Sequence, residues 1–288
     1  MKKKFFKGIL LAIFAGGAIT ACSSDNDETN IDGPDTGEVT AKFKHRVLIE
    51  DFTGAWCGWC PRVSHAIELL KETPEVDSYV FGAIHNGDAM TVNGTSGLPT
   101  TLWNKFEIAS NQRGYPFAAI NRITEWKSPE PNNLKQAKDL IQTAGVPVGI
   151  KIASTLTPTG GTINFSLKLG ATYSAGLKYV CYVIENDVVK TNNPQQNYSD
   201  YYGGVDVMPD FVHNDVFLKS TGPVAGTTIT AEQTKSGAEI NFNQTIAYAS
   251  HTGSINNIEV IVMALNDKGD VVNVRKAKAN TTADYEKM

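Results

Sequence analysis

Apolar positions in residues 43–145 alternate between the spacing of strands and the spacing of helices. Buried-strand runs occupy residues 46–52, 79–84 and 116–122, and helical spacing occupies residues 61–73, 100–108 and 133–144. In the first helix Val63, Ala66, Ile67 and Leu70 recur at the helical period, which predicts one buried stripe. Strands that alternate with helices build a mostly parallel sheet covered by helices, so this segment predicts an α/β domain.

From residue 146 onward the spacing of apolar positions changes to a period of two. This alternation predicts strands at residues 146–152, 163–169, 177–184, 239–246, 258–265 and 271–275. Short strands separated by turn residues are typical of a β-sandwich, and residues 192–209 between them are expected to form a long loop. We therefore predict an α+β protein of two domains, an α/β domain at residues 43–145 and an all-β sandwich at residues 146–288.

The amino-terminal residues 1–21 have the pattern of a signal peptide, with four lysines before an apolar run at residues 9–18. That run is about half of the ~20 residues that a membrane-spanning helix requires. The order Ile19-Thr20-Ala21-Cys22 resembles the bacterial lipobox, which implies a lipid attached to Cys22 and an anchor in the outer membrane. A plain signal peptide, cleaved nearby with Cys22 incidental, is the alternative.

Residues 22–42 are acidic and almost free of large apolar side chains, which predicts a flexible tether. An acidic stretch after a lipidated cysteine also resembles the surface-export signals of some Gram-negative lipoproteins, and a solvated spacer is the alternative. The whole chain has a net charge of −4, and removal of residues 1–21 takes away four lysines and no acid. This negative balance argues against nucleic acid as a partner.

The segment around Cys57 and Cys60 carries the candidate chemistry. A predicted strand runs into a short loop and then a helix, which places Cys57 at the helix start. Unpaired helix N–H groups stabilise a thiolate, and in such motifs the thiol pKa falls from ~8.5 into a range of ~3.5 to 7.5. Cys57 is therefore the expected nucleophile, and Cys60, three residues on, is the expected resolving thiol that closes the disulfide.

Metal and haem sites are disfavoured at these two cysteines. Structural zinc normally has four ligands, and after lipidation of Cys22 only Cys181 remains, with no histidine pair at metal spacing. Covalent haem attachment needs a histidine after the second cysteine, where this chain has Pro61. We expect no metal and no cofactor. A permanent structural disulfide is the alternative to a redox-active pair because the compartment is oxidising, whereas a reactive pair at a helix start is expected to be exposed.

The order Asp51-Phe52, Ala55-Trp56-Cys57 and Cys60 resembles the active-site strand and helix of thioredoxins. The resemblance implies a thioredoxin-like domain in which Asp51 is the buried acid that relays a proton to Cys60. An Asp51 side chain satisfied by backbone groups is the alternative. Glu50 is expected on the other face of the strand.

Thioredoxins also place a cis-proline opposite the disulfide, which makes Tyr115-Pro116 the best candidate. Leu98-Pro99 is the alternative, although Pro99 fits the opening of a helix. The sequence departs from the thioredoxin pattern in a polar insertion at residues 85–96 and in the pair Gly58-Trp59. The resemblance therefore does not fix the redox poise.

The lipobox, the segment from Glu50 to Cys57 and the all-β tail together resemble the 28-kDa outer membrane protein (Omp) family. The segments at residues 115–116, 121–122 and 213–216 match its pattern too. This resemblance implies a thioredoxin-like α/β domain followed by an immunoglobulin-like sandwich, in an outer membrane lipoprotein that faces the periplasm or the cell surface.

Two functions follow from these features. The first is a thiol-disulfide oxidoreductase, a reductase or isomerase of protein disulfides, whose partners are protein clients, a redox protein and the membrane. Trp56, Trp59 and Tyr115 then contact the client, although the two tryptophans equally fit a packing role. The second is a surface binding or scaffold lipoprotein with an inert disulfide.

Four further side chains are expected to have structural or solvated surroundings. His85 and Asp88 are expected in an exposed turn, with a place in the lining of the site as the alternative. His213 is expected in a solvated loop, with a metal ligand as the alternative, and Cys181 is expected as an inert core thiol.

Overall fold

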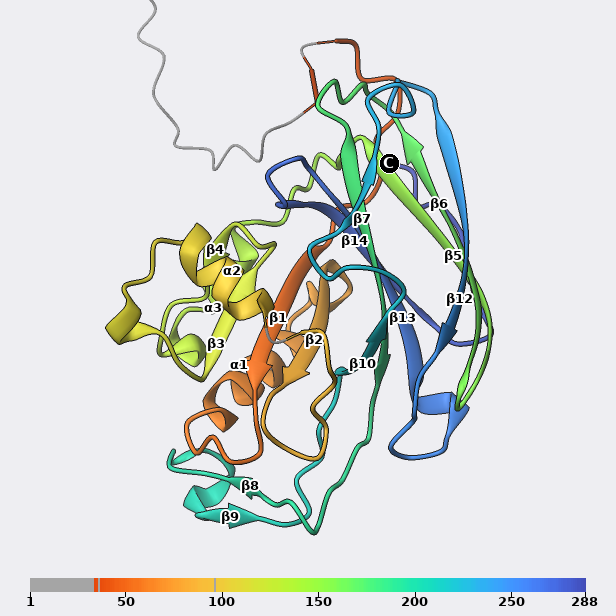
Figure 1. Cartoon of the computed structure of the whole chain (residues 1–288). Coiled ribbons are helices and arrows are strands. Elements are labelled where there is room, and N and C mark those ends of the chain that lie inside the picture. The colour runs from red at the N-terminus through yellow and green to blue at the C-terminus, as the bar shows by residue number, and fades with distance from the viewer. Residues whose placement is uncertain (1–33, 36, 96) are drawn as a thin grey trace, which may run out of the picture. The chain divides into compact units, whose positions relative to one another are not determined.

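The largest sheet contains strands from both parts of the chain (Figure 1). The computed structural model describes residues 34–35, 37–95 and 97–288. The strand order is β14-β13-β7-β10-β2-β1-β3-β4, and β11 pairs with β7. These strands are β1 (Val47–Thr53), β2 (Tyr79–His85), β3 (Phe117–Ile120), β4 (Thr124–Glu125), β7 (Leu177–Glu185), β10 (Val216–Ser220), β11 (Thr227–Ile229), β13 (Ile258–Leu265) and β14 (Val271–Lys278).

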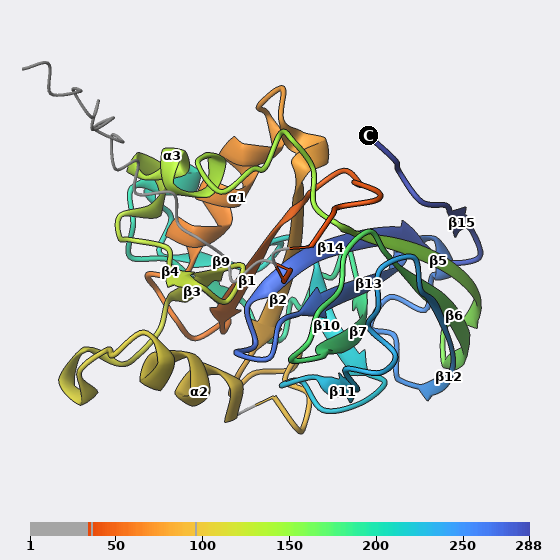
Figure 2. The ribbon, with the colours of Figure 1, turned by 90° about the horizontal axis from the view of Figure 1, so that it is seen from above.

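Strand β1 is the centre of the α/β part. It pairs in parallel with β2 and antiparallel with β3, and all seven of its residues are buried. Helices α1 (Pro61–Lys71) and α3 (Leu134–Lys138) cover one face, and α2 (Gly97–Lys105) covers the other (Figure 2). The predicted stripe of α1 packs there as expected, against Val47 and Ile49.

Two predicted helices have different bounds. Helix α2 starts at Gly97, so Pro99 lies in its first turn, where a proline needs no hydrogen bond for its missing N–H. Helix α3 ends at Lys138, well before the predicted end at residue 144. The backbone N–H groups of Leu140 and Ile141 bond three residues back, to Ala137 and Lys138, so tight turns replace the last predicted helical turns.

A second sheet covers the far end of the large one. It contains β5 (Val148–Thr157), β6 (Gly160–Leu169), β12 (Glu239–Ala247) and β15 (Thr282–Ala283), in the order β12-β6-β5-β15. Figure 2 shows β5, β6 and β12 curving beside β13 and β14. The apolar side chains between the two sheets form one large core, in which Phe165 stacks on Phe242 with ring centroids 4.7 Å apart.

The two predicted domains are joined by continuous strand pairing. Val216 of β10 pairs with Ala83 of β2, and the Ala83 N–H donates to the carbonyl oxygen of Asp215 at 2.7 Å. The described residues belong to one compact unit that is rich in sheet and has few helices. The predicted two-domain layout is therefore not confirmed. The sequence predicted β5, β6, β7, β12, β13 and β14, but it missed β10, which joins the two parts, and it did not predict a shared sheet.

Residues 193–208, between β7 and β10, form an ordered segment that we call the strap. The strap contains β8 (Gln195–Gln196), β9 (Val207–Met208) and a 3₁₀ turn (Tyr201–Gly204), within the predicted long loop. In Figure 1 the β8–β9 hairpin lies beside the loop that follows β1.

The signal peptide and Cys22 lie outside the described residues. At the other end of the predicted tether, Asp35 and Thr40 donate backbone hydrogen bonds to the carbonyl oxygens of Thr172 and Gly170. This part of residues 22–42 is therefore attached to the strand-rich region rather than free. Among the described residues, no helix combines the length and apolar character needed to cross a membrane.

Candidate functional site

Cys57 and Cys60 form a disulfide at the amino end of α1, with Cα atoms 5.4 Å apart. Cys60 is the N-cap residue of the helix, and its N–H donates to the Cys57 carbonyl oxygen at 3.1 Å. Cys57 therefore lies in the turn that leads into the helix, directly before it. The prediction of a cysteine pair at a helix start is confirmed.

The expectation that this pair is exposed is wrong. Cys57 is only 4% exposed and Cys60 only 1%. The strap covers them: the N–H groups of Gln196 and Tyr198 each donate at 2.7 Å, to the carbonyl oxygens of Ala55 and Gly58. The side-chain amide of the strap's Gln195 donates to the Cys57 carbonyl oxygen at 3.1 Å.

Trp56 and Trp59 flank the disulfide and remain about half exposed, at 47% and 50%. The Trp56 indole N–H donates to the Asn86 carbonyl oxygen at 2.7 Å, and its ring meets the edge of Tyr115 with centroids 5.7 Å apart. The Trp59 ring meets Tyr198 in the same edge-on way, at 6.2 Å. Each tryptophan therefore packs on one side and presents apolar surface to solvent on the other.

The Tyr115-Pro116 bond is cis, as predicted. Phe117, the next residue, pairs with Phe52 near the end of β1, so Pro116 lies beside the strand end that leads to Cys57. Pro99 lies in α2 instead. The tertiary structure thus brings Tyr115, Pro116, Trp56 and the disulfide into one region.

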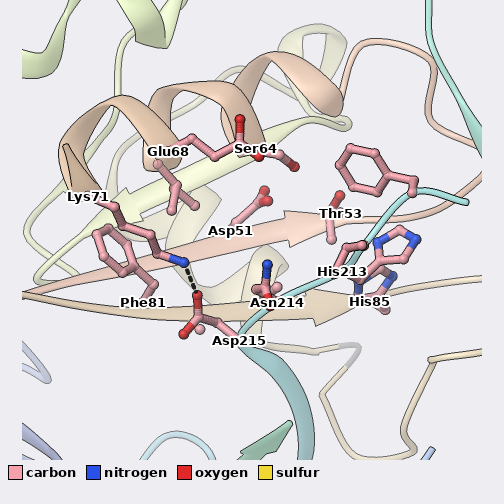
Figure 3. Close-up of a pocket in the computed structure, with 15 residues that line it drawn as sticks. Asp51, Thr53, Ser64, Glu68, Lys71, Phe81, His85, His213, Asn214 and Asp215 are labelled. Atoms are coloured by element: carbon pink, nitrogen blue, oxygen red, sulfur yellow. Dashed lines mark hydrogen bonds and ion pairs between the residues drawn. The ribbon is translucent and has the colours of Figure 1, made fainter. Parts of the chain in front are cut away.

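Asp51 is 2% exposed, and its Oδ1 atom has no hydrogen-bond partner. Burial raises its pKa well above the ordinary range, and the negative charge of Glu130 raises it further. Asp51 lines a cavity of about 50 Å³ together with Ser64 and Glu68 of α1 (Figure 3). A cavity of this size has room for water beside the buried carboxyl group.

The Glu50 side chain lies on the face of the sheet opposite to that of Asp51, as predicted. Its two carboxylate oxygens accept hydrogen bonds from the Arg122 guanidinium, each at 2.7 Å, and the Tyr182 hydroxyl donates to one of them at 3.1 Å. All three residues are buried. Because its charge is fully paired, Glu50 is a structural acid, whereas Asp51 is free to change its protonation.

His85, Asp88 and His213 were predicted in solvent, but their side chains are buried. Nδ1 of His85 lies 2.6 Å from Oδ2 of Asp88, which also accepts the Ala55 N–H at 2.8 Å. Burial by itself raises the pKa of Asp88, but these hydrogen bonds lower it overall. The Asp88 carboxylate thereby holds the loop before Cys57. The only sequence signal for this role is that Asp88 closely follows a predicted buried strand.

His213 lies 6% exposed beside His85, with ring centroids 5.1 Å apart. Burial, followed by repulsion from His85, lowers its pKa to about 3 despite an opposing effect of Asp88. Both histidines line the Asp51 cavity (Figure 3). The prediction failed because no local pattern brings residue 213 to residue 85; the strand pairing of β10 with β2 does so.

Other charged or reactive side chains have structural surroundings. Lys71 of α1 forms an ion pair with Asp215 at 2.8 Å at the cavity wall. Burial raises the pKa of the Cys181 thiol to about 12, consistent with the inert thiol predicted. Within the described residues, no group of three or more histidine, cysteine or acidic side chains has a geometry that could hold a metal ion.

The strap residues Gln195, Asn197 and Tyr198 belong to the site, and sequence reasoning missed all three. Their only signal was an unusually long polar connection. Asn197 is 1% exposed, and its side-chain amide donates to the carbonyl oxygens of Tyr201 and Val205 at 3.0 and 3.2 Å. It therefore fixes the conformation that presents Gln195 and Tyr198 to the disulfide.

Three comparisons place the chain among known proteins. A family model described as Outer membrane protein Omp28 matches residues 103–283, more than half of the chain. Thioredoxin-1 of Saccharomyces cerevisiae is 31% identical over 64 residues, which cover 22% of this chain and 62% of that protein, less than two thirds of its length. The solved structure of HBP35 of Porphyromonas gingivalis has a TM-score of 0.58 at 18% identity, covering 84% of this chain and 77% of that chain, which shows a shared fold.

Proposed function

The chain belongs to the Omp28 outer membrane protein family, and from this membership and the site at Cys57 we propose that it is a thiol-disulfide oxidoreductase of the cell envelope. The family name points to the outer membrane. The observation that carries the proposal is the bonded Cys57–Cys60 pair at the amino end of α1, the helix that borders the cavity of the buried acid Asp51.

The proposed reaction reduces or rearranges disulfides in protein clients. In the reduced protein the Cys57 thiolate attacks a client disulfide, which releases one client sulfur as a thiol and forms a mixed disulfide. The Cys60 thiolate then attacks the Cys57 sulfur, which releases the second client thiol and forms the Cys57–Cys60 disulfide. A dithiol donor protein supplies the two electrons that reopen this bond.

Asp51 has the properties required to accept the proton that Cys60 must lose. Burial raises its pKa, so the carboxylate is a stronger base than an exposed aspartate, and its Oδ1 atom has no competing hydrogen bond. The adjoining cavity offers a path by which this proton reaches solvent. The mechanism assigns nucleophile, resolving thiol and base to Cys57, Cys60 and Asp51.

The wider proposal concerns location, partners and layout. We assign lipid attachment to Cys22 and a redox protein as electron donor, with Trp56, Trp59 and Tyr115 contacting the client beside the disulfide. The thioredoxin-like part precedes a sandwich of the immunoglobulin type. The exposed tryptophan faces support the client contact, because apolar aromatic surface beside a reactive sulfur suits the binding of another polypeptide.

A second candidate function follows from the burial of both cysteines. An inert disulfide that holds the start of α1 in a scaffold protein also accounts for exposures of 4% and 1%. The two functions differ in whether the Cys57 sulfur exchanges with another protein.

Trapping with Cys60→Ala separates the two functions. This variant leaves Cys57 without its resolving thiol, so a mixed disulfide with a client should accumulate. Insulin serves as the disulfide-bonded probe, and non-reducing electrophoresis detects the adduct. The matched control, Cys57→Ala combined with Cys60→Ala, should give no adduct. Absence of an adduct with the single variant, together with unchanged insulin in the presence of wild-type protein and dithiothreitol, favours the scaffold.

A further inference from the structure

We propose that the strap is a built-in competitor for the client site, and that it must leave the disulfide before Cys57 can exchange with another protein. This inference rests on the proposed function, because it describes how that site is closed and opened. It also names the class of client: an extended polypeptide segment that takes the place of the strap.

The strap binds the motif as an extended peptide would. Two carbonyl groups of the motif loop, those of Ala55 and Gly58, accept hydrogen bonds from the backbone N–H groups of Gln196 and Tyr198. The strap residues between Gln195 and Tyr198 therefore run alongside residues 55–58 with main-chain pairing. Because these hydrogen bonds involve only main-chain groups, they do not depend on the side chains of the strap. Another extended polypeptide segment can therefore form the same bonds.

The Tyr198 ring supplies the side-chain contact. A Cβ atom added to Gly58 would lie 2.3 Å from the nearest atom of this ring, so the ring lies directly on the glycine between the two cysteines. The same ring meets Trp59 in a T-shaped contact. The strap therefore covers the surface on which an incoming chain would contact the disulfide.

The covering strap is incompatible with exchange. An attacking thiolate must approach the Cys57 sulfur, and the exchange rate depends on that access. Cys57 is 4% exposed beneath the strap, whereas Tyr198 above it is 61% exposed. A client or a donor protein must therefore displace Tyr198 and Gln195 to reach the sulfur.

The strap is organised so that it can move as one piece. Asn197 ties its turns together through bonds to Tyr201, Val205 and Ser199, all within the strap. None of the four apolar core clusters among the described residues includes a residue of the strap. Segments with few buried apolar contacts open at low free energy, so the strap can leave without unfolding the sheet.

Opening the strap precedes a balanced exchange. One thiolate of a donor dithiol attacks the Cys57 sulfur, the Cys57–Cys60 bond breaks, and Cys60 leaves as a thiolate. The second donor thiolate then attacks the donor sulfur of the mixed disulfide and releases Cys57 as a thiolate. The donor is oxidised to a disulfide and supplies two electrons.

The test compares reduction of wild-type protein with reduction of the double variant Gln195→Ala/Tyr198→Ala. Reduced thioredoxin is the protein dithiol, dithiothreitol is the small one, and alkylation followed by mass measurement counts free thiols over time. We expect the double variant to be reduced by thioredoxin about tenfold faster, because three contacts that hold the strap are weakened. The gain with dithiothreitol should be smaller. The matched control Val205→Ala alters an exposed strap side chain away from the motif and should behave as wild type.

The outcomes distinguish a failure of this inference from a failure of the proposed oxidoreductase function. If wild type and the double variant react equally fast, the strap is not a barrier and the oxidoreductase proposal stands. If both resist thioredoxin and dithiothreitol, the disulfide is inert and both proposals fail. Hydrogen exchange on wild-type protein gives an independent reading: the Gln196 and Tyr198 amides should exchange far faster than those of β1. Equal protection of these amides and β1 would overturn the strap opening.

Discussion

Glu50 and Asp51 are neighbours on β1, yet their side chains lie in two different regions. One region pairs the buried carboxylate with a guanidinium, and the other leaves a buried carboxyl oxygen without a partner. Glu50 meets a guanidinium in two parallel hydrogen bonds, in a network that joins β1, the turn after β3, and β7. Asp51 meets a small cavity, and its Oδ1 atom has no partner. A single residue step along a strand separates the two regions, because successive side chains point to opposite faces.

The difference shows two ways in which a fold accommodates a buried ionisable group. On the Glu50 face the charge is kept and paired: burial alone would lower the pKa of Arg122, but Glu50 and Tyr182 raise it above its ordinary value. On the Asp51 face burial favours the neutral form of Asp51, and likewise of His213. The paired Glu50 and Arg122 hold neighbouring elements together, whereas Asp51 and His213, which burial keeps neutral, can still exchange protons.

The largest expected effect comes from breaking the paired face. Arg122→Met leaves the Glu50 carboxylate buried without its partner, so the free energy of unfolding should fall by about 3 to 5 kcal/mol. Urea denaturation followed by circular dichroism measures this loss. The exposed pair Lys135–Asp139 is the matched control, and Lys135→Met should leave the denaturation midpoint unchanged. A small loss in Arg122→Met would mean that the network is not structural.

The next effect concerns His213 on the cavity face. Its folded-state pKa of about 3 lies below the ordinary value of 6.5, so as pH falls below 6.5 the unfolded chain takes up a proton that the fold does not. Wild-type stability should therefore fall relative to His213→Phe by about 2 to 3 kcal/mol between pH 6.5 and 4.5. Urea denaturation across this range measures the difference. Above pH 7.5 the difference should be constant, and a constant difference at all pH values would show that His213 is not held neutral.

Asp51 gives the opposite slope. Its folded-state pKa is raised, so above the ordinary value of 3.8 the unfolded chain loses its proton first, and stability falls as pH rises towards the folded-state pKa. Against Asp51→Asn, which cannot ionise, wild-type protein should lose about 1.4 kcal/mol per pH unit at most. Denaturation midpoints of the two proteins from pH 4 upward measure this slope. Parallel midpoints would place the Asp51 pKa in its ordinary range.

Much of the local structure could be predicted from the sequence. The helix after the cysteine pair, the stripe that it buries and the main strands depend on the spacing of nearby apolar residues, and they form close to the predicted bounds. The opposite faces of Glu50 and Asp51 follow from the same local geometry. The cis bond at Tyr115-Pro116 was predicted from its likeness to a known family rather than from spacing.

The surroundings of the disulfide could not be predicted. Both cysteines are buried, and residues 195–198, far along the chain, bond to the carbonyl groups of residues 55, 57 and 58 around them. The pairing of β10 with β2, which carries His213 to His85, likewise joins distant segments. No local pattern encodes such contacts, since they depend on which strands become neighbours in the sheet.

By itself, the sequence determined the local elements: a cysteine pair before a helix, an acid on each face of one strand, and a change to strands after residue 145. Only the tertiary structure decided that strands of both parts share a sheet, that one acid is paired and the other is not, and that the strap covers the disulfide. The physical reason is one of range. Backbone preference and hydrophobic period act over a few residues, whereas burial and charge pairing depend on residues brought together from the whole chain.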